Sequence, residues 1–423
     1  MSRAQHSRWR FMAYGLLGLP LAMAALPVYV QIPAYYSSNL GLALASTGWV
    51  LFLARLVDTV QDPWLGRYID RLHGGLNPWL IAGAVLLGLA FLGLWLPPVS
   101  SAYLGAWLAI MLVIAYTAHS MLSIAYLSWG ARLSVDEFNP NTALLGAAAW
   151  REGAGLFGVI LASVIPSWIL TQPAATIPSH FGRYGLGFAA ILALALFALM
   201  HYAPSWQRKE CPQSSWRQLW QTMQANQGFK SLLLPYFINA ISVAIPSTLA
   251  LFFINDRLQA ASFAGAFLAT YFVAAAIGLP LWVMLAKKVG ALCAWRCGML
   301  LAILAFCGAA LLGVGDYSAY LVVCIAAGLA LGADLALPPV LLAQMIQHED
   351  SPSAYFGVWT LLGKLALALS GLALPLLALL DYQPGQVAGP ALAWIYAGLP
   401  CGFKLLALYL LYRIRPHTAG VNA

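Results

Sequence analysis

Apolar stretches of about twenty residues or more recur along the whole chain, separated by short polar segments. A helix of that length crosses a hydrocarbon core about 30 Å thick. Because hydrocarbon cannot satisfy the polar groups of a backbone, such segments must be helices rather than open sheet. The pattern therefore predicts twelve membrane-spanning helices, over residues 9–37, 44–70, 78–97, 102–131, 143–170, 182–202, 230–255, 261–286, 291–313, 317–347, 352–380 and 387–413.

The composition agrees with this pattern. Of the 423 residues, 62% are hydrophobic and 8% are charged, whereas a soluble globular protein carries about a quarter charged residues. We therefore expect an all-α polytopic membrane protein surrounded by the lipid bilayer. The sequence contains no Walker loop, no HExxH motif and no metal-ligand spacing among its six cysteines. It therefore predicts neither an enzyme nor a resident cofactor or metal.

The most polar stretch of the chain, residues 203–229, separates six predicted helices from six others. This division predicts an N-terminal six-helix bundle over residues 1–202, a linker over 203–229, and a C-terminal six-helix bundle over 230–423. Two such halves are typical of transporters in which a small-molecule substrate binds between the halves and is exposed to alternate sides of the membrane.

Basic residues predict the orientation of the chain. An even number of spans places both termini on one side, and nearly all loop Lys and Arg residues fall on that side. We expect both termini and the linker to be cytoplasmic, in the inner (cytoplasmic) membrane, and the protein to be a monomer. The net charge of +8 then follows from topology and does not indicate nucleic-acid binding. The first span is too long for a cleavable signal peptide.

Eight charged residues lie inside the predicted spans. A charge at the centre of a bilayer costs between about 2.5 and 17 kcal/mol, depending on the method, so each should be paired or line a wet cavity. Such residues are therefore candidates for function. They are Arg55, Asp58, Asp62, Arg151, Glu152, Asp334, Lys364 and Lys404.

The densest group lies in the second span. Arg55, Asp58 and Asp62 are three or four residues apart and so share one helical face, with the two carboxylates separated by about 6 Å of helical rise. Two carboxylates can share one Na⁺ or one proton, and Gln61 adds a neutral oxygen ligand. The alternative is that Arg55 neutralises Asp58 in a packed interface, which leaves Asp62 unexplained.

The second span and the following residues carry the motifs RLVDTVQDPWLGRYIDR and NPWLIAG. They resemble the glycoside-pentoside-hexuronide:cation symporters of the major facilitator superfamily. The resemblance extends to SIAYLSWGA, WREGAGLFG and SAYFGVWTLLGK. It implies a twelve-helix symporter in which Asp58, Asp62 and Ser120 bind the coupling cation. Positions Arg151 and Lys364 match the family's arginine and lysine.

Two positions depart from that family. The carboxylates that hold sugar hydroxyls are replaced by Ala22 and Ser123, so the resemblance does not extend to a galactoside substrate. Other candidates for the substrate site are the polar or aromatic residues Ser123, Asp334, Asn239, Tyr29 and Trp359. Asp334 either replaces a lost anchor or forms an ion pair, for example with Lys364. Arg55 and Glu152 are candidates for ion pairs or gating, and His119 is a neutral packed residue or a proton site.

Gly153, Gly155 and Gly158 match the dinucleotide motif GxGxxG, but they lie in a predicted membrane helix without the strand that the motif requires. Their spacing predicts close helix packing instead. The sequence thus favours cation-coupled symport of a small solute such as a glycoside. The alternatives are transport of an amphiphile on the same fold and, more remotely, a membrane enzyme or channel.

Overall fold

The computed structural model describes residues 3–71, 76–131, 140–203, 224–345, 352–387 and 389–413. Within these ranges the chain consists of helices and short turns, with no strand. Every predicted span coincides with a helical segment, so the all-α fold class is confirmed. The chain divides into two compact units, one formed by Met1–Leu42 with Leu53–Cys211 and the other by Ala43–Phe52 with Pro212–Ala423.

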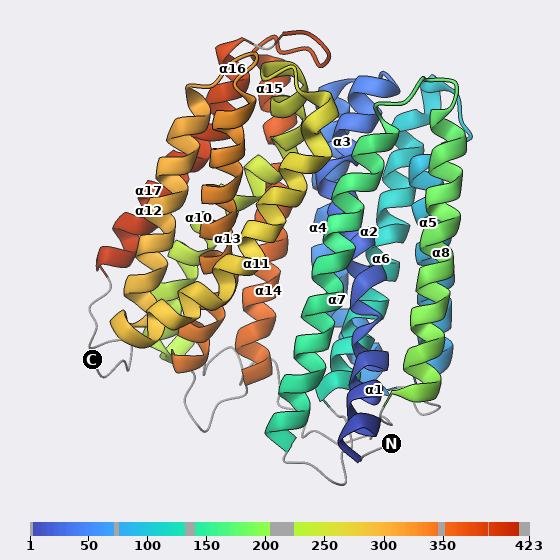
Figure 1. The fold of residues 1–423 in the computed structure, drawn as a ribbon, viewed down its shortest axis with the longest axis vertical. Helices are drawn as coiled ribbons and strands as arrows, with labels where there is room; N and C mark the ends of the chain where they lie inside the picture. The colour runs from blue at the N-terminus through green and yellow to red at the C-terminus, as the bar shows by residue number, and fades with distance from the viewer. Residues whose placement is uncertain are drawn as a thin grey trace. The chain divides into compact units, whose positions relative to one another are not determined.

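The first unit is a bundle in which α2 packs along α7, and α5 packs against α6 and α8 (Figure 1). Its α5/α8 interface is aromatic: Trp95 stacks on Phe181 with ring centroids 4.2 Å apart, and Phe91 stacks on Phe188 at 4.0 Å. The elements are α1 (Arg3–Gly15), α2 (Gly18–Val30), α3 (Ile32–Ala34), a π-helical turn (Tyr35–Asn39), α4 (Leu44–Arg71), α5 (Asn77–Trp95), a 3₁₀ turn (Ser101–Tyr103), α6 (Leu104–Ala131), α7 (Pro140–Ile169) and α8 (Ile177–Tyr202). Of α4, the part from Leu53 onward belongs to this unit, and the part before it belongs to the second unit.

In the second unit, α13 lies against α11 and α12, and α10 lies against α14 and α17. Trp295 of α12 is fully buried in the core of this unit. The elements are α10 (Gln227–Phe252), a π-helical turn (Phe253–Arg257), a 3₁₀ turn (Ala261–Phe263), α11 (Ala264–Val289), α12 (Ala291–Ala310), α13 (Tyr317–Met345), α14 (Pro352–Ser370), α15 (Ala373–Leu379), α16 (Pro390–Ala393), a π-helical turn (Trp394–Gly398) and α17 (Leu399–Arg413).

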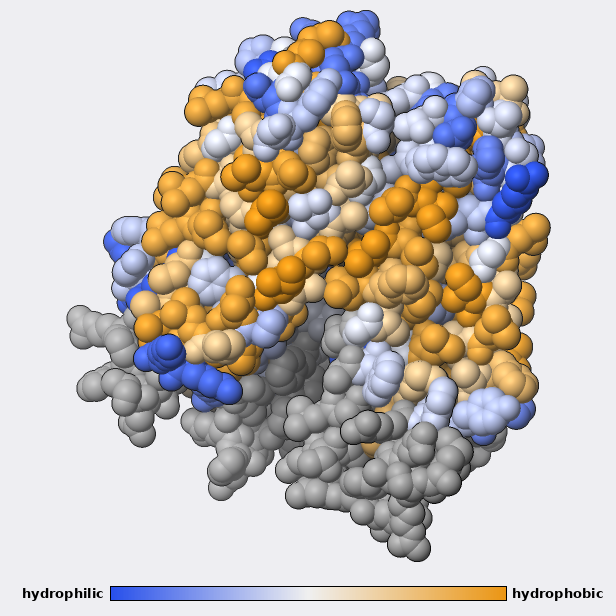
Figure 2. Space-filling model, viewed as in Figure 1, coloured by the Kyte–Doolittle hydropathy of each residue, from blue (hydrophilic) through white to orange (hydrophobic). Residues whose placement is uncertain are grey.

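The surface is that of a protein in lipid. Large apolar side chains are open to the surroundings, with Leu304 71% and Leu194 65% exposed. On the face shown in Figure 2, hydrophobic residues cover the flanks of the helices and polar residues gather toward their ends. Among the described residues, ten helical segments are long and apolar enough to cross a membrane. The other two predicted spans, α4 and α7, are as long but contain charged residues.

The glycines of the GxGxxG match show why this motif occurs in a membrane helix. A Cβ atom added to Gly158 of α7 would lie 2.2 Å from the carbonyl oxygen of Leu19 in α2. The two backbones are therefore in contact at this point, and the predicted packing role is confirmed for Gly158. It does not hold for Gly153, because a Cβ atom there would have no neighbour within 4 Å.

Helix α10 of the second unit begins with a side-chain cap. The side chain of Asn226 accepts a hydrogen bond from the backbone N–H of Phe229 at 3.0 Å and donates to the carbonyl of Met345 at 2.8 Å. It thereby caps α10 and ties its start to the end of α13. The last residues of the predicted linker 203–229 thus belong to this packed start, whereas residues 204–223 lie outside the described ranges.

A buried acid fixes the loop before α16. Asp256 lies in the π-helical turn that follows α10. Its carboxylate accepts hydrogen bonds from the hydroxyl of Tyr382 and from the backbone N–H of Gly385. Asp256 is 5% exposed. Because a buried carboxylate needs partners, this contact holds the 382–385 segment against the helix end.

Candidate functional site

The helix α4 places Asp58 in a buried polar cluster of the first unit. Oδ1 of Asp58 accepts hydrogen bonds from the hydroxyl of Ser120 at 3.0 Å and from Nε2 of Gln61 at 3.2 Å. Asp58 is 9% and Ser120 3% exposed. Ser120 comes from α6, so the cluster joins two helices. The structure therefore brings together three of the four residues predicted for the cation site.

The orientation of Gln61 differs from the expected one. Its amide nitrogen, not its oxygen, faces Asp58, and its Oε1 lies 2.8 Å from the hydroxyl of Thr117 in α6. A carboxylate oxygen accepts hydrogen bonds, so the amide N–H of Gln61 suits Asp58. Hard cations such as Na⁺ prefer oxygen ligands. To coordinate a cation held at Asp58, the amide of Gln61 would have to turn over.

Arg55 lies one turn before Asp58, and its guanidinium faces two aromatic rings. Its Cζ is 5.3 Å from the ring centroid of Tyr29 and 5.4 Å from that of Tyr116. Arg55 is 7% exposed, and its Nη2 has no hydrogen-bond partner among the described residues. The positive charge of the buried Arg55 guanidinium is thus stabilised in part by the electron-rich faces of these two rings. Tyr29, predicted to stack on a substrate, has its ring beside this guanidinium.

The remaining candidates of the first unit lie on α4, α6 and α7. Asp62 is half-buried one turn after Asp58 in α4. In α6, the hydroxyl of Ser123 lies 3.3 Å from Nδ1 of His119, with the donor set by the tautomer of the imidazole. Arg151 of α7 is half-buried, and its carbonyl oxygen lies against Gly18 of α2. The side chain of Glu152 lies outside the described residues.

In the second unit, Trp359 of α14 is buried and stacks on Tyr236 of α10, with ring centroids 3.4 Å apart and an interplanar angle of 18°. One face of the indole is therefore covered by a protein ring, which leaves less of it for the predicted substrate contact. Lys364, one to two turns further along α14, is half-buried.

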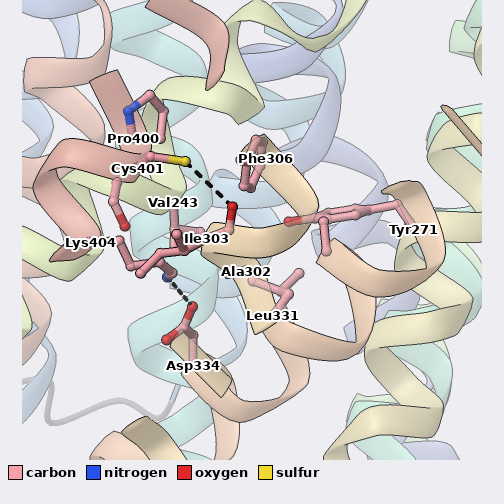
Figure 3. Close-up of a pocket in the computed structure, with 12 residues that line it drawn as sticks. Val243, Tyr271, Ala302, Ile303, Phe306, Leu331, Asp334, Pro400, Cys401 and Lys404 are labelled. Atoms are coloured by element: carbon pink, nitrogen blue, oxygen red, sulfur yellow. Dashed lines mark hydrogen bonds and ion pairs between the residues drawn. The ribbon is translucent and has the colours of Figure 1, made fainter. Parts of the chain in front are cut away.

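Asp334 belongs to a polar cluster of its own. Its Oδ2 is 2.8 Å from Nζ of Lys404, and Figure 3 shows this ion pair at the side of a small cavity. Asn239 contacts both charged groups: its Nδ2 donates to Oδ1 of Asp334 at 2.9 Å, and its Oδ1 accepts from Lys404 at 2.8 Å. Of the two roles expected for Asp334, the structure shows an ion pair, and the lysine is Lys404.

Sequence reasoning missed three contributors to these clusters. Thr117 lies one turn before Ser120 in α6, and this hydroxyl pair at helical spacing is the signal that could have found it. Tyr116 and Trp295 carried no such signal, because aromatic residues make up 13% of the chain. Within the described part of the chain, no group of three or more His, Cys, Asp or Glu side chains is placed to hold a metal ion.

The comparisons with known proteins agree with this architecture. Residues 11–416 match the family described as MFS/sugar transport protein. The inner membrane symporter YicJ of Escherichia coli (strain K12) is 22% identical over 264 residues, which cover 60% of this chain and 55% of that protein. The aligned region thus spans about half the length of this curated relative.

Several solved structures share the fold. The nucleoside transporter NupG superposes with a TM-score of 0.72 at 13% identity, covering 97% of this chain and 100% of that one. A bacterial homologue of the lysosomal transporter Spinster, in an inward-facing conformation, gives 0.66 at 15% identity over 97% and 96% of the two chains. A bacterial homologue of the iron transporter ferroportin gives 0.65 at 13% identity over 98% and 99%.

The family match over residues 11–416 makes this all-helical membrane protein a transporter of the major facilitator type. The chain belongs to the MFS/sugar transport protein family. Its relatives are transporters rather than enzymes.

Proposed function

We propose that this protein is a secondary active symporter of the inner membrane, driven by Na⁺ or H⁺, that moves a small solute such as a glycoside. The observation that carries the proposal is the buried carboxylate of Asp58, joined to α6 through Ser120. A carboxylate inside a membrane span is costly, and such residues commonly mark the pathways of transported ions or protons.

The Asp58 cluster suits reversible ion binding. Ser120 and Gln61 donate to the carboxylate, and both side chains also carry oxygen atoms that can ligate a cation. Asp62, one turn away, adds a second carboxylate on the same helical face. A cation or proton can therefore take the place of these hydrogen bonds at the carboxylate, which is what loading and unloading require.

One finding supports the nature of the solute, and a second supports coupled transport. The family to which the chain belongs is described as one of sugar transport, and the aligned relative is named a symporter of the inner membrane. We infer that uptake runs with the cation gradient by alternating access. The excess of basic residues in the predicted cytoplasmic loops supports an orientation with both termini inside.

The test is gradient-driven uptake in proteoliposomes. The solutes are p-nitrophenyl glycosides of glucose, galactose and xylose, each assayed under an imposed Na⁺ gradient at equal pH and under a pH gradient without Na⁺. Wild-type protein should accumulate at least one solute with one of the two gradients. Asp58→Asn and Asp62→Asn should abolish accumulation, and the exposed Asp316→Asn serves as the matched control.

Accumulation by Asp58→Asn at the wild-type rate would overturn the assigned cation site. The solute class is checked in parallel with a fluorescent lysolipid, which tests the amphiphile alternative. A wild-type protein that moves the lysolipid and none of the glycosides would overturn the glycoside proposal while leaving the cation site open to the same Asp58 test.

A further inference from the structure

A closed ring of hydrogen bonds joins three helices of the second unit. Lys404 of α17 donates to Oδ2 of Asp334 in α13 and to Oδ1 of Asn239 in α10, both at 2.8 Å. Asn239 completes the ring through its Nδ2, which donates to Oδ1 of Asp334 at 2.9 Å. The indole N–H of Trp295 in α12 donates to the same Oδ1 at 2.8 Å. Both oxygens of the carboxylate and both ends of the amide are therefore in use.

The two charges in this ring cancel each other inside the protein. The side chains of Lys404 and Asp334 are 5% and 8% exposed. Removal of one partner from such a pair leaves an uncompensated buried charge, which is strongly destabilising, whereas replacement of both partners together is often neutral. The stability of the protein should therefore depend on whether the ring is neutral overall, rather than on the presence of the two charges themselves.

The ring lies next to proline residues in all three helices. Pro235 precedes Asn239 by four residues, Pro338 follows Asp334 by four, and Pro400 precedes Lys404 by four. A proline inside a helix removes one backbone hydrogen bond and allows the helix to bend. Pro235 and Pro338 are internal to α10 and α13, whereas Pro400 lies in the first turn of α17. The side-chain ring thus connects the three helices one turn from these prolines.

The cavity beside the ring argues against direct solute binding there. Its wall includes Asp334, Lys404, Ser242 of α10 and Tyr271 of α11 (Figure 3). It has room for about one water molecule. A glycoside would not fit there without displacing the ring.

We propose that Asp334 and Lys404 are positioning residues for transport. Together with Asn239 they form a neutral clasp that holds α10, α13 and α17 together beside the turns that contain these prolines. The clasp binds neither the solute nor the coupling ion. The effect on transport rests on the proposed symport function. The ring also has a polarity, because the carboxylate faces the two donors Trp295 and Asn239. A lysine at position 334 would place its ammonium group against these N–H donors. The acid and the lysine therefore cannot exchange positions.

The experiment compares four variants with wild type: Asp334→Asn, Lys404→Gln, the double variant D334N/K404Q and the exchanged pair D334K/K404D. In the double variant, the uncharged amides of the new Asn and Gln side chains can form hydrogen bonds in place of those of the ring. Thermal unfolding in dodecyl maltoside is followed by tryptophan fluorescence. Uptake of the p-nitrophenyl glycoside accumulated by wild type is measured well below the lowest Tm, so that all assayed variants are folded.

Each single variant should lower Tm and reduce the maximal uptake rate at least tenfold, with the KM for the glycoside within threefold of wild type. The double variant should recover a Tm near wild type and an uptake rate within threefold, with unchanged dependence on the cation. The exchanged pair should not recover. A folded double variant without uptake, a tenfold rise in KM, or a single variant with full uptake would overturn the proposal.

The Tm values test the clasp independently of the symport proposal, because they require no transported solute. If wild type accumulates none of the glycosides, the symport proposal fails in its present form, and the order of Tm values still tests the clasp. Equal Tm values for the single and double variants would then overturn the neutral-pair argument.

Discussion

The hydroxyl of Ser120 in α6 donates a 3.0 Å hydrogen bond to Oδ1 of Asp58 in α4. Both residues are buried, so water cannot replace the bond when it is lost. A hydrogen bond to a charged group contributes about 1.5–3 kcal/mol, which corresponds to about tenfold or more in an equilibrium constant. The strength of this single contact therefore bears directly on how Asp58 binds an ion.

Ser120→Ala should change ion coupling in a way that identifies the ion. If Na⁺ drives uptake, loss of the oxygen ligand should raise the half-saturating Na⁺ concentration about tenfold. If H⁺ drives uptake, loss of the hydroxyl donor should change the dependence of uptake on the imposed pH gradient. Ser231→Ala, whose hydroxyl bonds within its own helix, is the control. Unchanged dependence on both ions would contradict the prediction.

Arg55→Gln should raise the affinity for Na⁺, whereas Ser120→Ala should lower it. Side chains three residues apart on a helix are neighbours, so the guanidinium of Arg55 should repel a cation bound at Asp58. Its removal should lower the half-saturating Na⁺ concentration at least several-fold. Arg55→Lys retains the charge and should stay near wild type. Weaker Na⁺ binding in Arg55→Gln would show that Arg55 supports the site instead.

Gly158→Ala should destabilise the first unit. The added methyl group would lie 2.2 Å from the carbonyl oxygen of Leu19, and overpacking of this kind costs about 1–3 kcal/mol. Gly153→Ala in the same helix meets no atom within 4 Å and should leave Tm unchanged or raise it, because Ala favours a helix over Gly. Equal Tm values for the two variants would refute the close contact of α2 and α7.

Tyr382→Phe should lower the free energy of unfolding by about 1.5–3 kcal/mol at neutral pH, because Asp256 loses a donor. Tyr317→Phe, whose hydroxyl makes a long bond of 3.4 Å at the surface, is the control. Thermal unfolding in detergent measures the difference, and a loss no larger than that of the control would contradict it.

The pH dependence gives a second measurement on Tyr382. Burial, and then the negative charge of Asp256, raise the pKa of Tyr382 above its usual value. An unfolded tyrosine ionises near pH 10, so the contribution of Tyr382 is complete below that pH and is lost as the pH rises above it. The difference in Tm between wild type and Tyr382→Phe should therefore shrink between pH 8 and 11. A constant difference would contradict this assignment.

Much of the architecture follows from the sequence because the solvent is lipid. Apolar stretches of the right length must be helices in hydrocarbon, and each predicted span coincides with helical structure. The proximity of Asp58 and Gln61 follows from helical spacing, and that of Ser120 was implied by the family resemblance. The side chain of a buried charge also had to find a partner, which pointed to Asp334 and Lys404 as separate candidates.

What the sequence left open is how side chains on different helices meet. No periodicity predicts that Lys404 pairs with Asp334, because α17 and α13 are distant in the chain and their register depends on packing. The orientation of the Gln61 amide depends on the charge of its neighbour, and the stacking of Trp359 on Tyr236 depends on the contact of α14 with α10. Aromatic residues are too frequent in this chain for one to be singled out by type.

The cap at Asn226 has a practical consequence for separating the two halves of the molecule into independently expressed fragments. Because Asn226 both starts α10 and bonds to Met345, a C-terminal fragment that began after this residue would expose the first N–H groups of α10 and lose its tie to α13. A break placed upstream of residue 224 keeps both bonds within one fragment. Complementation between two separately encoded fragments is thus best attempted with the second gene starting before the cap.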